Sequence, residues 1–107
     1  MVYLETIRKN PKNQDWVAIS YDVAILNKNF IREFQNYINW GVISWHKTLS
    51  EEFIREFQDK VNWYYISCYQ RLSKEFVIEF SDKINFTFLM KNNNISDEIK
   101  DLCKMFV

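Results

Sequence analysis

Apolar positions recur along this chain with a step of 23 residues. The clearest series is aromatic and comprises Trp40, Trp63 and Phe86. A second series comprises Phe53, Phe76 and Ile99, and an earlier copy with one extra residue starts at Trp16. A fixed period of this size is typical of stacked units that cannot bury their apolar faces alone. The pattern therefore predicts four repeats, which span residues 16–39, 40–62, 63–85 and 86–107.

The second half of each repeat predicts a helix. Phe53, Phe57 and Val61 lie at i, i+4 and i+8, which places an apolar stripe along one side of that helix. Ser50 can cap its first turn, and Glu51 adds negative charge at the positive end of its dipole. The matching segments predict four such helices, at residues 28–38, 51–61, 74–84 and 97–106.

The first half of each repeat predicts a shorter helix of about two turns. In the segment WGVISWHK, the apolar step from Trp40 to Ile43 is i, i+3, and Asn39 stands at the capping position. A β-strand is the alternative, because the segment is rich in β-formers, but strict alternation is absent. We expect the Asn at this boundary to end one helix in the left-handed conformation and to open the next.

These elements predict an all-α protein. The expected architecture is a short α-solenoid of four two-helix repeats of about 23 residues, each with a short first helix and a longer second helix. Residues 1–15, with Leu4 and Ile7 before the helix breaker Pro11, predict an N-terminal cap over the first repeat. One Gly and one Pro argue against a β-sandwich or barrel. We expect residues 1–107 to form a single domain.

Charge and hydropathy argue against two classes of partner, nucleic acid and membrane. Lys and Arg number 14, as do Asp and Glu, so the zero net charge gives no field that attracts nucleic acid or anionic lipid. No apolar run reaches the length of a membrane span, and the first residues lack the apolar region of a signal peptide. We expect a soluble intracellular protein without a membrane or nucleic-acid partner.

Candidate catalytic and metal-binding groups are few. Cys68 and Cys103 are 35 residues apart and the chain has one His, so neither a metal site nor a cofactor is expected. A serine recurs at Ser20, Ser44 and Ser67, but no His or Asp recurs with it. We expect these serines to pack closely and to bond a carbonyl one turn back, and we do not expect an enzyme.

A glutamate recurs at one position of the longer helix. The series comprises Glu33, Glu56 and Glu79. Because Lys60 follows Glu56 by one turn, we expect surface pairs at i, i+4. A solvated face is the simplest interpretation, while an acidic binding stripe or a carboxylate site stays open.

The positions that vary between repeats are rich in aromatic residues. If stacking fixes the core positions, the varied positions should face outward or line one edge of the array. Exposed aromatic clusters mark contact surfaces. The candidate residues for binding a protein partner are Tyr21, Trp45, His46, Tyr64, Tyr65 and Tyr69. The alternative is that these side chains fill contacts between neighbouring repeats.

One string within the repeat resembles a known pattern. N/D-W-x-x-I-S followed by L-S-x-x-F-I-x-E-F is similar to a tandem repeat of uncharacterised proteins of giant DNA viruses and tailed phages. The residues that carry the likeness are Trp40, Ile43, Ser44, Leu49, Ser50, Phe53, Ile54, Glu56, Phe57, Asn62 and Trp63. It covers about residues 15–90, and the insertion in the first copy and the loss of Trp and Ser in the fourth depart from it. The resemblance implies a viral or phage protein in the host cytoplasm, but no mechanism.

These observations together predict a non-enzymatic, protein-binding helical repeat module. It would bind and block a host or bacterial protein, such as a defence component. The alternative is a self-assembling structural protein that stacks chains through its end units. Nucleic-acid binding through aromatic residues with Arg55 and Arg71 is electrostatically weak.

Overall fold

The protein folds into short helices joined by turns and loops. The computed structural model describes residues 2–22 and 26–106, and in these ranges it contains helices and no strand. The predicted all-α class is therefore confirmed, and the β alternative for the short segments is wrong. The molecule is elongated, with extents of 50 × 20 × 18 Å. Residues 1, 23–25 and 107, which fall in the predicted cap and the first and fourth repeats, lie outside the described residues.

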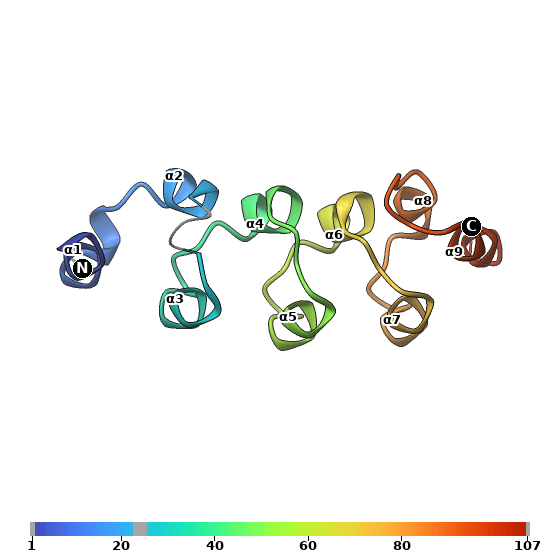
Figure 1. Cartoon of the computed structure of the whole chain (residues 1–107), viewed down its shortest axis with the longest axis horizontal. Helices are drawn as coiled ribbons and strands as arrows, with labels where there is room; N and C mark the ends of the chain where they lie inside the picture. The colour runs from blue at the N-terminus through green and yellow to red at the C-terminus, as the bar shows by residue number, and fades with distance from the viewer. Residues whose placement is uncertain (1, 23–25, 107) are drawn as a thin grey trace.

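The helices lie in two rows along the molecule (Figure 1). The A row, at the top of the view, holds α2 (Trp16–Tyr21), α4 (Trp40–His46), α6 (Trp63–Tyr69) and α8 (Phe86–Leu89). The B row holds α3 (Lys28–Glu33), α5 (Glu51–Glu56) and α7 (Lys74–Glu79). One end carries α1 (Val2–Lys9) and a 3₁₀ turn (Pro11–Asn13), and the other end carries α9 (Asp97–Cys103). Successive A-row helices contact one another.

Side-chain caps start the helices of both rows. Ser50 Oγ accepts a hydrogen bond from the Phe53 amide at 3.1 Å, and Asn39 Oδ1 accepts one from the Val42 amide at 3.0 Å. The matching residues cap the other helices in the same way, namely Asp15, Asn27, Asn62, Ser73, Asn85 and Ser96. The predicted caps are confirmed. The left-handed conformation expected at Asn39 is wrong, because its φ is −82° and no described non-glycine residue has a positive φ.

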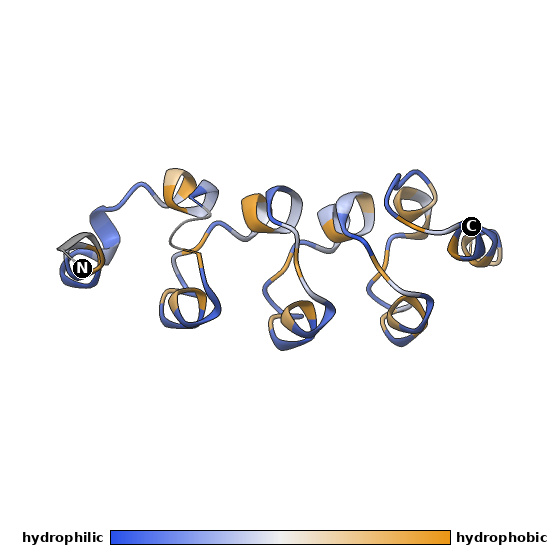
Figure 2. Ribbon diagram, viewed as in Figure 1, coloured by the Kyte–Doolittle hydropathy of each residue, from blue (hydrophilic) through white to orange (hydrophobic). Residues whose placement is uncertain are grey.

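The core lies between the two rows, and a tryptophan joins them. The Trp40 ring packs 5.2 Å from Phe57, and its indole N–H donates to the Gln35 carbonyl at 2.9 Å. Trp63 repeats both contacts one step later, with Phe80 and with the carbonyl of Gln58. Figure 2 shows that the B-row helices turn their hydrophobic side toward the A row. Of the retained aromatic positions, Phe86 is therefore buried, while the three tryptophans are half-buried and pack against the core.

The B-row helices are shorter than predicted. Helices α3, α5 and α7 have six residues each, whereas α2 has six and α4 and α6 have seven, so the expected longer second helix is wrong for these pairs. Helix α5 ends at Glu56 instead of residue 61, and hydrogen-bonded turns follow it. A longer helix would pair the Asn62 amide with the Gln58 carbonyl. In the structure that amide donates to Ser44 Oγ, and that carbonyl accepts from the Trp63 indole. Contacts with two A-row residues, Ser44 and Trp63, therefore replace the helical hydrogen bond, and sequence propensity alone does not reveal them.

The recurring serines connect successive A-row helices. Ser44 Oγ donates to the Trp40 carbonyl one turn back at 2.6 Å, as predicted, and Ser67 repeats the bond with Trp63 at 2.7 Å. Each hydroxyl also accepts from the backbone amide of the next capping Asn, which the sequence did not indicate. These amides belong to Asn62 and Asn85. Because Ser44 is fully buried, both bonds fix where the next helix begins.

Ion pairs link successive helices on the outer side of the B row. Arg32 binds Glu56 through two nitrogens, and Arg55 binds Glu79 with its closest contact at 2.9 Å. Arg8 of α1 makes the same bidentate pair with Glu33. These hydrogen bonds hold the pKa of all three glutamates below the usual value. The recurring glutamates therefore form a solvated, ion-paired ladder.

The expected i, i+4 pairing with lysine is wrong. Within the described residues, Glu56 pairs with Arg32 of the preceding helix, while Lys60 Nζ donates to Asn36 Oδ1 at 3.0 Å. An arginine fork can engage both oxygens of a carboxylate, whereas a lysine offers a single charged point. The pairing across helices therefore replaces the pairing along one helix.

Candidate protein-binding surface

The aromatic residues singled out in the sequence gather on the A row. Tyr21 of α2 contacts His46 of α4, with ring centroids 4.8 Å apart. Trp45 of α4 lies 6.4 Å from Tyr69 of α6, and that ring contacts Tyr65 at 6.1 Å. The contacts continue along α6 to Tyr64 and reach Phe88 of α8 at 4.5 Å. We call this set the aromatic face: Tyr21, Trp45, His46, Tyr64, Tyr65, Tyr69 and Phe88.

The aromatic face is partly open to solvent. Tyr21, Trp45, Tyr64 and Tyr69 are 40%, 41%, 46% and 50% exposed. His46 is also exposed, and Tyr65 and Phe88 are half-buried. The geometry is therefore consistent with both interpretations of these residues, as an outward contact surface and as filling between neighbouring repeats. The rings fill the contacts between successive helices on one side and present the remaining area outward.

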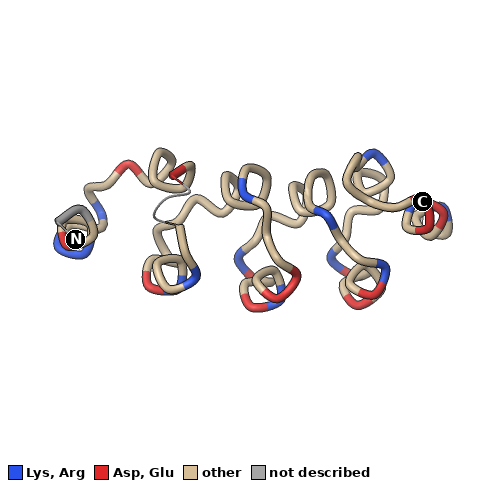
Figure 3. The backbone as a smooth tube through the Cα atoms, in the orientation of Figure 1, with Lys and Arg blue, Asp and Glu red and all other residues tan. Residues whose placement is uncertain are grey.

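The A row is also almost free of charge. The helix sequences WVAISY, WGVISWH, WYYISCY and FTFL contain no Asp, Glu, Lys or Arg. The B-row sequences KNFIRE, EEFIRE and KEFVIE each carry three or more charged residues. Figure 3 shows this separation along the molecule. An uncharged row that exposes aromatic rings is the composition typical of the centre of a protein interface.

The one glycine of the sequence lies beneath one of these rings. Gly41 lies in the first turn of α4, where Tyr65 from α6 covers it. A Cβ at Gly41 would lie 3.7 Å from the Tyr65 ring and 3.3 Å from Asn39 Oδ1, the oxygen that caps α4. The Tyr65 ring therefore leaves room for a Cβ at ordinary contact distance, and the capping oxygen of Asn39 is the tighter neighbour.

Buried amides hold the C-terminal ends of α4 and α6. Gln70 is 3% exposed, and its Nε2 donates at 2.8 Å to the carbonyls of both Ser44 and Lys47. Its Oε1 accepts from the Leu49 amide at 2.9 Å. Asn92 has the same role in the next repeat, because its Nδ2 donates to the carbonyls of Ser67 and Gln70. These contacts fix the loops beside the aromatic face.

Three hollows follow the loops that join the A row to the B row. The first, of about 790 Å³, lies where the loops before α5, α7 and α9 meet. The second, of about 270 Å³, lies between Trp45 and Tyr69 and includes Arg71. The third, of about 290 Å³, lies near Leu26 and Phe53. Thr48 borders all three, so they form one edge of the molecule.

Sequence reasoning missed several residues of this region. Phe88 extends the aromatic face, and Gln70 and Asn92 hold its loops. Phe88 was detectable from its place among the varied aromatic positions. The two amides gave no signal, because they do not recur at a fixed step and their polar side chains resemble those of solvated loops.

The surroundings of both cysteine thiols disfavour the thiolate. Burial raises the pKa of the Cys68 thiol and of the Cys103 thiol, which favours the protonated form. In residues 2–22 and 26–106, no group of three or more His, Cys, Asp or Glu side chains could hold a metal ion. No helix in the same ranges has the length and apolar character needed to cross a bilayer.

Comparisons with protein families, curated proteins and solved structures found no match to this chain. The geometry of the aromatic face and its edge is therefore the basis on which a function can be inferred.

Proposed function

We propose that the chain is a short α-solenoid of four two-helix repeats, with α1 as its N-terminal cap. Three contacts that recur at nearly the same sequence step support this architecture. They are the tryptophan indole bond, the serine-to-asparagine bond and the arginine–glutamate pair, represented by Trp40, Ser44 and Arg32. Ile7 of α1 is fully buried, which is consistent with a cap over the first repeat.

We further propose that this solenoid is a non-enzymatic protein-binding module. One observation carries the proposal: seven aromatic rings run in contact from Tyr21 to Phe88 across four uncharged helices, and several stay about half exposed. Trp and Tyr are enriched among the few residues that contribute most of the binding energy at protein interfaces. Repeat arrays commonly bind along such an extended face. The partner is a host or bacterial protein that the module blocks, and this aspect of the proposal rests on the likeness to viral and phage repeats.

Alanine substitution on the two rows tests the surface. The double variant Trp45→Ala/Tyr69→Ala removes two rings that are 41% and 50% exposed. Ile78→Ala is the matched control, because Ile78 is 52% exposed but lies in the B row. Affinity purification from host extract with quantitative mass spectrometry measures which proteins each variant retains.

We expect at least one protein to bind the wild type and Ile78→Ala equally and to be depleted at least tenfold by the double variant, since hot-spot rings contribute about 2 kcal/mol or more each. Circular dichroism must show the same helix content for all three proteins. Equal retention by the double variant would remove the aromatic face from the proposal.

Self-assembly is the second candidate. It is favoured by apolar side chains that stay open at the α9 end, where Met105 is 79% and Phe106 is 52% exposed. Sedimentation velocity over a hundredfold concentration range distinguishes the two functions. A constant monomeric sedimentation coefficient eliminates self-assembly, and a coefficient that rises with concentration in the wild type but not in Met105→Ser/Phe106→Ser supports it.

A further inference from the structure

One arginine of the described chain stands apart from the others. Arg8, Arg32 and Arg55 each hold a glutamate in a bidentate pair on the B-row side. Arg71 is exposed, and within the described residues it has no hydrogen bond, ion pair or ring contact. Its planar guanidinium therefore remains available for a carboxylate from another molecule.

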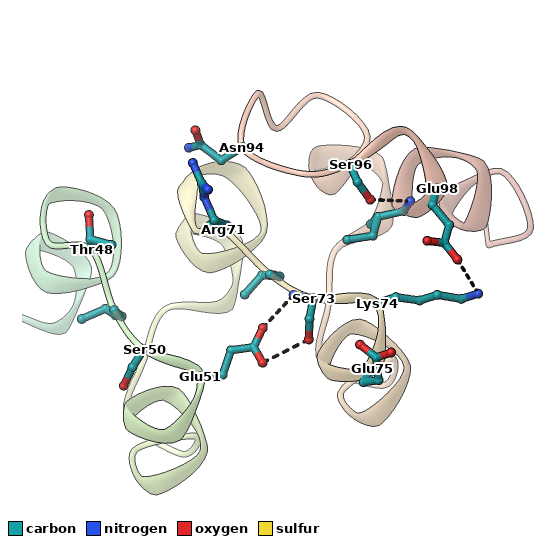
Figure 4. A pocket seen from close by; sticks show the side chains of 13 residues that line it. Thr48, Ser50, Glu51, Arg71, Ser73, Lys74, Glu75, Asn94, Ser96 and Glu98 are labelled. Carbon is teal, nitrogen blue, oxygen red and sulfur yellow. Dashed lines mark hydrogen bonds and ion pairs between the residues drawn. The ribbon is translucent and has the colours of Figure 1, made fainter.

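Arg71 lies on the wall shared by two of the hollows described above. Figure 4 shows its side chain extending toward the loop of Asn94 and away from Glu51. Glu51 is engaged elsewhere, because its two oxygens accept from the amide and the hydroxyl of Ser73 at 2.7 and 3.0 Å. Glu98 is likewise held by Lys74 at 2.9 Å. Of the three glutamates that line the larger hollow, Glu51 and Glu98 therefore have other partners. The third, Glu75, lies beyond Ser73 as seen from Arg71 (Figure 4).

The cleft between Trp45 and Tyr69 combines open rings with positive charge. Its lining contains Lys47 and Arg71 but no Asp or Glu among the described residues. The complete lining is Trp45, His46, Lys47, Thr48, Tyr69, Gln70, Arg71 and Asn94. A hollow of about 270 Å³ with two cations and two exposed rings fits an acidic side chain flanked by apolar ones.

The walls of this cleft are fixed before any ligand arrives. Gln70 is bonded on three sides, to Ser44, Lys47 and Leu49. Asn94 Nδ2 donates to the Tyr69 carbonyl at 2.8 Å, which ties the opposite wall to the end of α6. A preorganised cleft loses little conformational freedom on binding.

We propose that this cleft, which we call the Arg71 cleft, receives an acidic segment of the partner protein. This inference rests on the proposed protein-binding function and names the partner's chemistry. An Asp or Glu carboxylate binds Arg71 and Lys47, and the neighbouring apolar side chains of the same segment pack on Trp45 and Tyr69. Nucleic acid fits less well, because tight binding to a phosphate backbone uses about six to ten cationic contacts.

Selection from a random displayed peptide library tests the proposal without knowledge of the partner. The library is panned against the wild type, against Lys47→Gln/Arg71→Gln and against a control, Lys60→Gln/Lys104→Gln. The control also removes two positive charges, but at positions outside the Arg71 cleft. A short oligothymidine, titrated into the wild type by fluorescence anisotropy, provides the nucleic-acid arm.

We expect the wild type to enrich peptides that contain Asp or Glu next to an aromatic or aliphatic residue. Recovery of these peptides should fall about tenfold on the Lys47→Gln/Arg71→Gln variant, because charge-assisted hydrogen bonds are lost, and about twofold or less on the control. Recovery should also fall as NaCl rises from about 0.05 to about 0.5 M.

Other outcomes overturn the proposal in distinguishable ways. Enrichment of neutral or basic peptides that are lost on Trp45→Ala/Tyr69→Ala rejects the acidic partner but leaves the aromatic face in place. Failure to enrich any peptide, or enriched peptides that neither double variant affects, rejects the Arg71 cleft as a binding site. Oligothymidine binding tighter than that of the best peptide assigns the cleft to nucleic acid instead.

Discussion

The hydroxyl of Ser44 joins two successive helices of the A row, because it accepts a hydrogen bond from the Asn62 amide at 2.9 Å. The same hydroxyl donates to the Trp40 carbonyl at 2.6 Å, and the side chain is fully buried. A single small residue therefore sets both the end of one turn and the start of the next helix. Ser67 repeats the arrangement with Asn85 at 2.9 Å.

Ser44→Ala should destabilise the fold by about 1–3 kcal/mol, because it leaves the half-buried Asn62 amide without its partner. Urea unfolding followed by circular dichroism measures the change. Ser81→Ala is the control, since no side-chain hydrogen bond of Ser81 is found among the described residues, and it should change stability by less than about 0.5 kcal/mol. Equal effects of the two substitutions would reject the structural role of Ser44.

Trp40→Phe should cost about 0.5–1.5 kcal/mol, because it keeps an aromatic ring but removes the indole N–H that donates to Gln35. Position 86, which also starts an A-row helix, carries Phe. Trp45→Phe is the matched control, because Trp45 is 41% exposed. The same urea titration compares the two. A larger loss for Trp45→Phe would contradict the stabilising role of the Trp40 indole bond.

Gln70→Met should cost about 2–4 kcal/mol, since it buries a side chain of similar size but leaves the carbonyls of Ser44 and Lys47 and the amide of Leu49 without their partner. Gln35→Met is the control. Gln35 is half-buried and donates only to the Arg32 carbonyl in the described structure, so the expected loss is below about 1 kcal/mol. Hydrogen exchange of the Leu49 amide provides a local readout, which should accelerate only in Gln70→Met.

Acid should weaken the fold through the arginine–glutamate ladder. Hydrogen bonds from arginine lower the pKa of Glu33, Glu56 and Glu79 in the folded state. The unfolded chain, with a glutamate pKa of about 4.3, then binds more protons, so the stabilisation is present above that value and is lost as the pH falls through the lower folded values.

Urea titrations between neutral pH and about pH 3 measure this loss. Glu56→Gln should show a shallower decline in the free energy of unfolding than the wild type, because it removes one titrating partner. Asp59→Asn is the control, since Asp59 is exposed and its side chain forms no hydrogen bond or ion pair within the described residues. Identical pH profiles for Glu56→Gln and the wild type would exclude the ladder as a source of stability.

The sequence predicted the helices well because their signals are local. Ser50 and Asn39 predict helix starts because their side chains can cap the first turn. The apolar step from Phe53 to Phe57 predicts which side of the helix is buried. The end of α5 was predicted poorly, because it depends on contacts with Ser44 and Trp63 that lie one helix away. Propensity acts within a segment, whereas these contacts act between segments.

The sequence predicted which residues form the candidate surface, but it did not predict how they contact one another. The varied aromatics were visible as a set, and the structure joins them into one run of rings from Tyr21 to Phe88. The Arg71 cleft was not predictable, because it depends on which arginines find a glutamate. The sequence does not show which of Arg55 and Arg71 has a glutamate within reach. Only the structure shows that Arg55 is paired.

Site-specific photo-crosslinking tests most directly the claim that the aromatic face is the binding surface. A photoreactive phenylalanine analogue replaces Tyr69 in one version of the protein and Ile78 in another, which places it on the A row or on the B row at similar exposure. After irradiation in host cells, we predict a discrete crosslinked protein band with the probe at position 69 and none at position 78. Crosslinking from position 78 alone, or equally from both positions, would contradict the account.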